Sequence, residues 1–192
     1  MRTIPLSPHP ATPCPAVHQL SVDYGWQAPG HLLLRYRLRG ALAQLRLPPP
    51  GPAPTRRDEL WRSTCFEAFL RRDGNPGYWE VNFTPRGDWA IYRFDAYRQG
   101  MHAPQTVAAP AIACTGDAGT HELTACLDLS GWDRETGGWQ LAVAAALGTP
   151  SGEISYWAAH HPPGTPDFHA AAAFRLTLPP IPRPTPSSGE TP

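Results

Sequence analysis

Apolar residues occur along this chain in short runs of five to ten positions, and in many of these runs they alternate with polar residues. Alternation with a period of two is typical of β-strands that bury one face. Gly, Pro, Asp and Thr residues bound the runs, and no run has the length and periodicity of a convincing helix. The pattern predicts an all-β fold, a β-sandwich or jelly roll of roughly ten antiparallel strands with at most short helical turns. Outside the central region, strands are predicted at residues 31–40, 41–48, 105–114, 121–129, 139–148, 153–160 and 172–178.

The chain is long enough for one domain with a hydrophobic core, since it has 192 residues of which 41% are apolar. Proline and serine dominate both ends, which offer little to bury. We therefore expect residues 1–16 to be loosely ordered, residues 17–178 to form the folded domain, and residues 179–192 to be a disordered tail. Residues 95–101 are compatible with one helical turn, and the alanine-rich segment 139–148 is interpreted as a strand because its neighbours are strands.

Aromatic and acidic residues are densest between residues 60 and 98, where the sequence predicts three strands joined by two hairpins. A four-residue loop in the first hairpin places Leu70 opposite Trp79. A loop of two or four residues in the second places Thr84 opposite Trp89. One face of the three strands then forms core: Phe66, Ala68, Leu70, Trp79, Val81, Phe83, Ala90, Tyr92 and Phe94. The other face carries Cys65, Glu67, Phe69, Tyr78, Glu80, Asn82, Trp89, Ile91 and Arg93.

This second face mixes carboxylates, an amide and a guanidinium with aromatic rings, whereas a merely solvated face would carry Lys, Thr and Ser. Rings beside fixed hydrogen-bonding groups suit a sugar, whose C–H faces stack on aromatics while its hydroxyls bond to polar side chains. A purely structural interpretation stays open, in which Glu80 and Arg93 form a cross-strand ion pair and Tyr78 and Trp89 are covered by a loop.

Histidines and an aspartate gather in the segment "SYWAAHHPPGTPDFH", residues 155–169. Imidazole and carboxylate groups at such spacing are weak candidates for a divalent metal, because the fixed spacing of a helical metal motif is missing. A loop at the rim of the sheet, in which Tyr156 and the histidines help to close over a ligand, is the favoured interpretation. The metal candidates are His160, His161, Asp167 and His169.

Two further chemistries stay open as alternatives. Glu67 and Glu80 are diagonal neighbours in the predicted register and would suit the acid and the base or nucleophile of a glycosidase. Met101 is the one methionine besides Met1 and could serve as an axial haem ligand, although nothing else in the sequence supports haem. No cofactor is therefore expected. Phosphate-binding loops, nucleophile elbows and nucleotide fingerprints are not found in the sequence.

The formal net charge is zero and the pI is about 7.1, so no overall basic field favours nucleic acid or an anionic membrane. No apolar run has the length of a transmembrane helix, and residues 1–17 do not resemble a signal peptide. We expect a cytoplasmic protein with four reduced cysteines, whose spacing fits neither a zinc site nor a disulfide framework. The sequence leaves the oligomeric state open.

The segments "LWRSTCFEAFL", "GYWEVNFTPRGDWAIYRFDAYRQGM" and "ISYWAAHHPPGTPDFH" together resemble the bacterial DOMON-like domains, which are relatives of the family nine carbohydrate-binding modules. The resemblance covers about residues 17–178. It implies a β-sandwich that binds sugar or, in some DOMON relatives, haem, and it does not imply catalysis. The positions that fit the shared motif are Trp61, Cys65, Glu67, Tyr78, Glu80, Asn82, Trp89, Tyr92, Tyr156, Trp157, His161, Asp167 and His169.

Together these observations predict a non-catalytic domain that binds a carbohydrate or a sugar-containing small molecule. A haem- or metal-binding module and a glycosidase-like enzyme are the alternatives. The predicted ligand-binding residues are Trp61, Glu67, Tyr78, Glu80, Asn82, Trp89, Arg93, Tyr156 and His161.

Overall fold

The computed structural model describes residues 1–132 and 137–178, and its regular structure is almost entirely β-strand. The predicted all-β fold is confirmed. Three single turns of 3-10 helix, η1 (Leu42–Gln44), η2 (Leu60–Arg62) and η3 (Ala171–Ala173), are the helical elements of the described part. The strands are β1 (Arg2–Pro8), β2 (Val17–Ala28), β3 (His31–Gly40), β4 (Cys65–Arg72), β5 (Tyr78–Phe83), β6 (Trp89–Phe94), β7 (Ala111–Gly116), β8 (Thr120–Asp128), β9 (Trp139–Gly148), β10 (Ile154–Ala158) and β11 (Leu176–Leu178).

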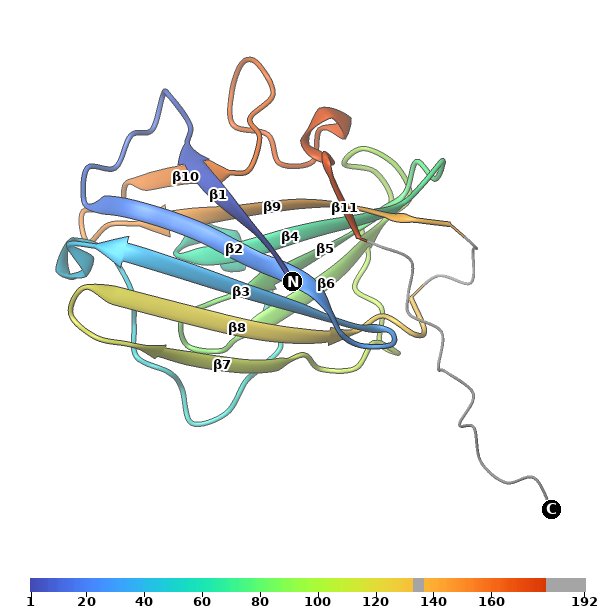
Figure 1. Cartoon of the computed structure of the whole chain (residues 1–192), viewed down its shortest axis with the longest axis horizontal. Helices are drawn as coiled ribbons and strands as arrows, with labels where there is room; N and C mark the ends of the chain where they lie inside the picture. Colours follow the sequence, from blue (N-terminus) through green and yellow to red (C-terminus); the bar gives the residue numbers. More distant parts are fainter. Residues whose placement is uncertain (133–136, 179–192) are drawn as a thin grey trace.

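The strands follow the order β6-β5-β4-β9-β10-β1-β2-β3-β8-β7, with β11 paired to β9, and every strand pairing is antiparallel. This ribbon folds into two layers (Figure 1). We call the layer of β2, β3, β8 and β7 the front sheet and the layer of β6, β5, β4, β9 and β10 the back sheet. Strand β1 joins them, because its first part pairs with β2 and its end pairs with β10.

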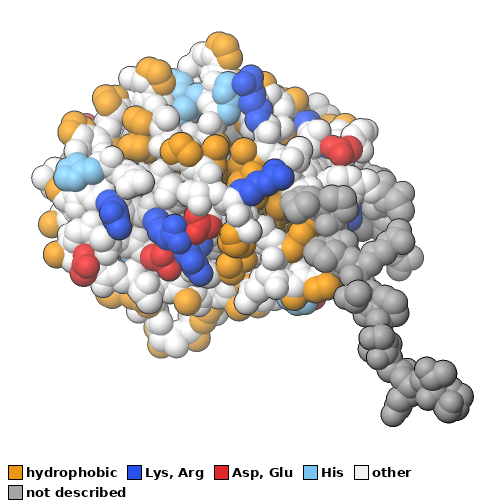
Figure 2. Space-filling view, viewed as in Figure 1, with side chains coloured by type: hydrophobic (Ala, Val, Ile, Leu, Met, Phe, Trp, Pro, Cys, Tyr) orange, Lys and Arg blue, Asp and Glu red, His pale blue; other side chains and the backbone are white. Residues whose placement is uncertain are grey.

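The main core lies between the two sheets. Along β3, inward residues such as Leu34 and Tyr36 are fully buried, whereas Arg35 and Arg37 alternate with them and point to solvent. These arginines form ion pairs with Asp23 and Glu122 on the neighbouring strands, and the charged side chains lie near the middle of the outer face of the front sheet (Figure 2). The front sheet thus has one dry face and one polar face.

The back sheet is different, because β4 and β5 are buried on both of their faces. Its inner face contributes to the main core, and its outer face carries a second apolar cluster that includes Phe69, Tyr92 and Phe94. Phe168 and Phe174, from the segment between β10 and β11, pack onto this cluster. The aromatic density of residues 60–98 is explained by this burial on two sides.

The predicted register of the first hairpin is confirmed. Leu70 lies opposite Trp79, and Glu67 lies opposite Asn82. Because side chains alternate along a strand, Glu67, Glu80 and Asn82 share the outer face of the back sheet.

The predicted register of the second hairpin is wrong by one residue. Thr84 lies opposite Asp88, with its N–H donating to the Asp88 carbonyl over 2.9 Å, and the three residues between them form the loop. Gly87 closes this loop with a φ of 88°, the left-handed conformation that ends a three-residue hairpin loop. Because the loop has three residues and not the predicted two or four, every side chain on β6 points to the opposite face of the sheet from the one predicted.

Two predicted ligand-binding residues are corrected as a result. Trp89 and Arg93 lie on the inner side of β6, where Trp89 is part of the main core and the Arg93 guanidinium lies 5.5 Å from the centre of the Trp79 ring. Tyr92 and Phe94, predicted to be main core, lie instead on the outer face with Glu80. The proposed cross-strand pair of Glu80 and Arg93 is replaced by Glu80 opposite Tyr92.

The amino-terminal prediction is also wrong, since residues 2–8 form β1 and Leu6 is buried in the core. The prolines are tolerated because Pro8 stands at the end of the strand and Pro5 lies where β1 pairs with a neighbour, β2, on one side only. Strand β2 was not predicted. Residues 41–48 form η1 and a loop in place of a strand, with Leu42 and Leu45 buried at helical spacing. Residues 95–101 form turns rather than a helical turn, and the predicted tail 179–192 lies outside the described residues.

All four cysteines are free. No helix in the described residues is long and apolar enough to cross a membrane.

Candidate functional site

A cavity of about 510 Å³ opens on the outer face of the back sheet. Strands β4 and β5 form its floor, and η2, the segment after β6 and the segment after β10 form its walls. Its lining combines charged side chains with aromatic rings. The lining residues are Trp61, Glu67, Glu80, Phe94, Arg98, Met101, Tyr156, Pro166, Phe168 and His169.

A second hollow, of about 600 Å³, lies between residues 42–50 and residues 114–121. Its lining consists mainly of leucine, proline and small residues, and its titratable groups are Cys114, Asp117 and His121. The back-sheet cavity is the better candidate because buried carboxyl groups, an imidazole and a guanidinium converge there.

Two glutamates form the floor of the cavity. Glu67 and Glu80 come from adjacent strands and are only 4% and 5% exposed. Burial raises the pKa of Glu67 well above its ordinary value, and the neighbouring Glu80 carboxyl raises it further. Burial also raises the pKa of Glu80, although a hydrogen bond from Asn82 opposes this shift. The pair therefore holds a proton to higher pH than a solvent-exposed pair would.

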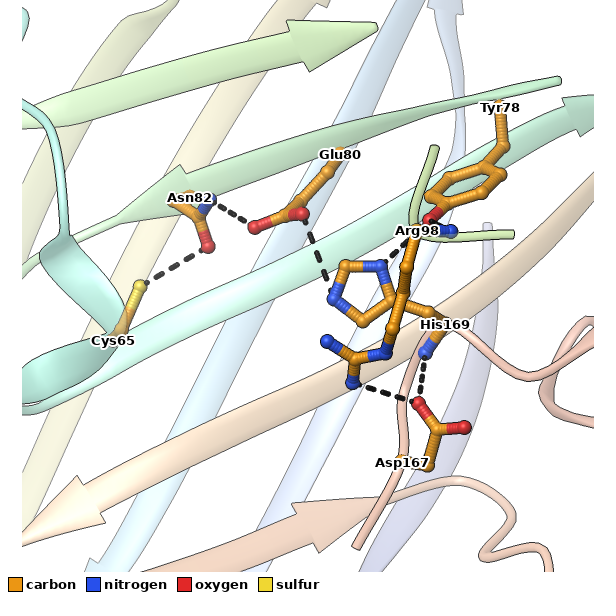
Figure 3. A network of polar contacts seen from close by, with 7 residues as sticks. All are labelled: Cys65, Tyr78, Glu80, Asn82, Arg98, Asp167 and His169. Carbon is orange, nitrogen blue, oxygen red and sulfur yellow. Dashed lines mark hydrogen bonds and ion pairs between the residues drawn. The ribbon is translucent and has the colours of Figure 1, made fainter. Parts of the chain in front are cut away.

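A chain of buried hydrogen bonds fixes Glu80 (Figure 3). The Cys65 thiol donates to Asn82 Oδ1 over 3.4 Å, and Asn82 Nδ2 donates to Glu80 Oε1 over 2.7 Å. Burial, together with the Glu67 and Glu80 carboxyls, raises the pKa of Cys65 well above its ordinary value. Cys65 is consequently a thiol that orients the Asn82 amide and not a reactive thiolate.

His169 faces Glu80 from the opposite wall. The Tyr78 hydroxyl accepts from the Arg98 backbone N–H over 3.2 Å and lies 2.7 Å from His169 Nδ1. Because burial raises the pKa of Tyr78 to about 12, the hydroxyl keeps its proton and can donate it to Nδ1. Nε2 then carries the ring hydrogen and points toward Glu80 Oε2, 3.8 Å away. Burial, followed by the nearby Arg98, lowers the pKa of His169 to about 4, so the ring is neutral at physiological pH.

An ion pair ties the two wall segments together. Arg98 Nη2 lies 2.9 Å from Asp167 Oδ1, and the Tyr97 hydroxyl donates to Asp167 Oδ2 over 2.8 Å. Burial opposes ionisation of Asp167, but these hydrogen bonds outweigh it and lower its pKa. Arg98 has a φ of 53°, a strained conformation for a non-glycine residue. Gly100, two residues later in the same turn, also has a positive φ, of 66°.

Aromatic rings form the remaining walls. Trp61 on η2 is half-buried and meets Tyr92 edge to face at 6.1 Å, while Tyr156 on β10 meets Phe168 at 6.0 Å. Phe94 lines the cavity from the end of β6. The cavity therefore presents apolar ring surfaces around a polar floor.

The structure brings together part of the predicted site. Trp61, Glu67, Glu80 and Tyr156 line the cavity, and Tyr78 and Asn82 stand behind it as hydrogen-bond partners of His169 and Glu80. Trp89 and Arg93 lie on the other face, as described above. The predicted residue His161 directs Nε2 to the Ser7 carbonyl at 2.9 Å and packs against His9.

Several lining residues were not predicted. Phe94 was assigned to the core, and Arg98, Pro166 and Phe168 were not considered. Met101 was considered only as a haem ligand, and His169 as a metal candidate and a rim-loop histidine but not as one of the predicted ligand-binding residues. For His169, the resemblance to the DOMON-like motif was the one signal in the sequence that could have indicated a role in the site. The weak metal candidates do not converge, since no group of three His, Cys, Asp or Glu side chains able to hold a metal is found in residues 1–132 and 137–178.

Comparisons with known proteins show the fold. No family model matches the chain, and no curated protein matches it. A protein from Bacteroides uniformis, for which carbohydrate binding has been suggested, has a similar structure: the TM-score is 0.59 at 15% identity, over 91% of this chain and 85% of that one. This similarity supports the β-sandwich fold and shows nothing about the ligand of this protein.

Two structures of a family nine carbohydrate-binding module from Caldicellulosiruptor kristjanssonii are more distantly similar. The complex with glucose has a TM-score of 0.47 at 10% identity, over 76% of this chain and 69% of that one. The complex with cellotriose has a TM-score of 0.46 at 11% identity, over 84% and 73%. Similarity at this level establishes neither family nor function.

Proposed function

We propose that this protein is a non-catalytic domain that binds a carbohydrate or a sugar-containing small molecule in the back-sheet cavity. One observation carries the proposal: buried, oriented polar groups and aromatic rings line the same open cavity of about 510 Å³. A volume of this size is typical of small-molecule sites. Trp61 and Tyr156 offer ring surfaces for the C–H face of a sugar, and Glu67 and Glu80 accept from its hydroxyls.

The orientation of the polar groups supports binding. The hydrogen bond from Asn82 holds the Glu80 carboxyl, and His169 Nε2 faces it at 3.8 Å, so the carboxyl is positioned before the ligand arrives. Preorganisation of this kind lowers the entropy lost on binding. The resemblance to DOMON-like domains and the similarity in fold to the Bacteroides uniformis protein agree with this assignment.

Glycoside hydrolysis is the second candidate, because Glu67 and Glu80 both line the cavity and both have raised pKa values. A proton-holding acid beside a second carboxyl is the arrangement that glycosidases use. Cleavage of 4-nitrophenyl glycosides, abolished in both Glu67→Gln and Glu80→Gln, would replace the binding proposal with an enzymatic one.

Haem binding gains no support from the site. Met101 and His169 both line the cavity, but Nδ1 of His169 is bonded to Tyr78 and Nε2 faces Glu80. A Met/His axial pair would have to break this arrangement. Addition of haemin followed by an absorption spectrum tests this alternative directly, since a Soret band would favour it.

The binding proposal is tested with a panel of mono- and disaccharides, followed by thermal shift and by tryptophan fluorescence. We expect at least one sugar to raise the melting midpoint and to perturb Trp61. Glu80→Ala and Asn82→Ala should weaken that response, whereas Glu153→Ala, an exposed acid in the turn before β10, should leave it unchanged. Absence of any response in the wild-type protein, or unchanged binding by both cavity variants, would contradict the proposal.

A further inference from the structure

The floor of the cavity has more hydrogen-bond acceptors than the protein satisfies. Glu80 Oε1 accepts from Asn82, but Oε2 lies 3.8 Å from His169 Nε2, beyond hydrogen-bond length. The thiol of Cys65 lies beside the Glu67 carboxyl, but it is a weak donor and its one hydrogen is directed to Asn82 Oδ1. Two buried carboxyl groups therefore face the cavity with unused acceptor capacity.

The charges around the cavity are also unbalanced. Two acids of the lining, Glu67 and Glu80, face one cation, Arg98, because His169 is neutral. Arg98 pairs with Asp167 at 2.9 Å (Figure 3). Its charge also lowers the pKa of Glu80, but burial outweighs this effect. The remaining groups near Glu80 add no positive charge, since Tyr78 is a neutral phenol and Tyr92 donates to the acid Asp58. Burial raises the pKa of both carboxyls, and a proton retained by the pair reduces the repulsion between them.

The walls favour a cation over an anion. The rings of Trp61, Tyr156, Phe168 and Phe94 line the cavity around this acidic floor. Aromatic faces attract ammonium groups through the ring quadrupole, and the attraction grows when the cation is removed from water. An ammonium group supplies three hydrogen-bond donors and a positive charge, which are the two features that the floor lacks.

We propose that the ligand carries an ammonium group that binds over Glu67 and Glu80, so that the preferred class is an amino sugar. This inference rests on the proposed carbohydrate-binding function. An ammonium group there favours the ionised carboxyls, so its binding lowers their pKa and releases protons that the pair still holds. A neutral sugar in the same cavity brings no such charge and releases no proton.

Calorimetric titration at about pH 6.5, where aliphatic amines are protonated, tests the inference. The probes are three matched pairs: glucosamine and glucose, galactosamine and galactose, mannosamine and mannose. We expect at least one hexosamine to bind on the order of tenfold more tightly than its neutral parent, as one desolvated cation–π or charge-assisted contact provides. The N-acetylated form of that hexosamine, which lacks the charge, should lose the advantage. Repetition in buffers of different ionisation enthalpy should show proton release for the hexosamine alone.

Variants separate the contribution of the two acids. Glu67→Gln and Glu80→Gln keep the size of the side chain and an acceptor oxygen but remove the negative charge, so each should reduce the preference for the hexosamine over its neutral parent at least severalfold. Glu153→Gln, remote from the cavity, should behave as wild type. Melting midpoints at or above that of the wild type would show that both cavity variants are folded.

The outcomes distinguish the two proposals. Equal affinity for a hexosamine and its parent, with no proton release, overturns the ammonium inference and leaves the carbohydrate-binding proposal in place. Failure of every sugar in the panel, charged or neutral, to bind the wild-type protein overturns both. Tighter binding of the hexosamine that persists in both Gln variants also overturns the inference, because the charge would then be recognised elsewhere.

Discussion

The hydroxyl of Tyr78 lies 2.7 Å from Nδ1 of His169 and joins β5 to the segment that follows β10. Because the same hydroxyl accepts from the Arg98 backbone, it also holds the segment that follows β6. One phenol on the sheet thus contacts both wall segments of the cavity and occupies Nδ1 of His169. It acts together with the Arg98–Asp167 ion pair, which joins the same two segments at the rim.

Replacement of Tyr78 by phenylalanine should therefore loosen both walls. The change leaves the ring in the apolar cluster but removes two hydrogen bonds, so we expect a loss of about 1–3 kcal/mol in the free energy of unfolding. Chemical denaturation measures it. Tyr97→Phe is the matched control, since the hydroxyl of Tyr97 is bonded to Asp167 at the exposed rim, and it should cost less than about 0.5 kcal/mol. Equal losses in the two variants would argue against the role given to Tyr78.

Acidification should destabilise the fold through His169. Its pKa is lowered to about 4 in the folded protein from an ordinary value of 6.5, so the unfolded chain takes up a proton first as pH falls. This contribution is fully present above pH 6.5 and is lost between pH 6.5 and 4, at a total of about 3 kcal/mol. His169→Gln removes it, and the difference in stability between wild type and variant should shrink by that amount from pH 7 to about pH 4. His18→Gln, at an exposed position of β2, is the matched control, and the contribution of His169 should remain in this variant.

Glu67 should have the opposite effect. Its raised pKa means that the folded state retains a proton that the unfolded state has released. The protein therefore loses stability as the pH rises from the ordinary pKa of a glutamate toward the pKa of Glu67 in the folded state. Glu67→Gln removes the ionisable group, and we expect the variant to exceed wild type by about 1–3 kcal/mol at mildly alkaline pH and to show a flatter profile. Denaturant titrations across the pH range measure this. An unchanged slope would show that Glu67 is not the group that titrates.

Trp61 should serve binding more than stability. Trp61→Ala removes one wall of the cavity while its ring is only half-buried, so we expect at least a tenfold loss in affinity for the sugar that binds wild type. Trp26→Ala is the control of the same residue type, because Trp26 is also half-buried but lies on β2 in the front sheet. Similar affinity losses in the two variants would remove Trp61 from the site.

The fold class was predictable because alternation is a local property of the chain. It identified the first hairpin correctly, including Glu67 opposite Asn82, since a four-residue loop and the apolar pattern agree there. The alanine-rich segment 139–148 was also predicted as a strand, against its helical propensity, and forms β9. This strand pairs with β4, and its side chains Ala142 and Ala144 belong to the second apolar cluster.

The second hairpin could not be read from alternation alone. On β6, aromatic residues occur on both faces, so either register buries rings, and the loop length decides between them. Gly87 was the available clue, because a glycine at the end of a three-residue loop commonly takes the left-handed conformation. Without that clue, Trp89 and Arg93 were placed on the wrong face.

The walls of the cavity were harder still to predict. Arg98, Phe168 and His169 lie on segments without regular structure, and their positions depend on contacts with residues about 70 to 100 positions away in the chain. No periodic pattern encodes such contacts. The sequence could indicate the floor, built on paired strands, but not the walls that enclose it.

Strand β1 has a consequence for how the protein must be handled. It pairs with β2 along most of its length and with β10 at Ser7 and Pro8, so it covers an edge of each neighbour. Removal of residues 1–8 would leave β2 and β10 with unpaired backbone groups in the middle of the ribbon. Exposed strand edges recruit other chains, and a shortened protein should self-associate or precipitate even where its cavity residues are intact. An affinity tag that must be cleaved close to this end, or that restrains it, therefore carries a risk of aggregation that a tag at the other end avoids.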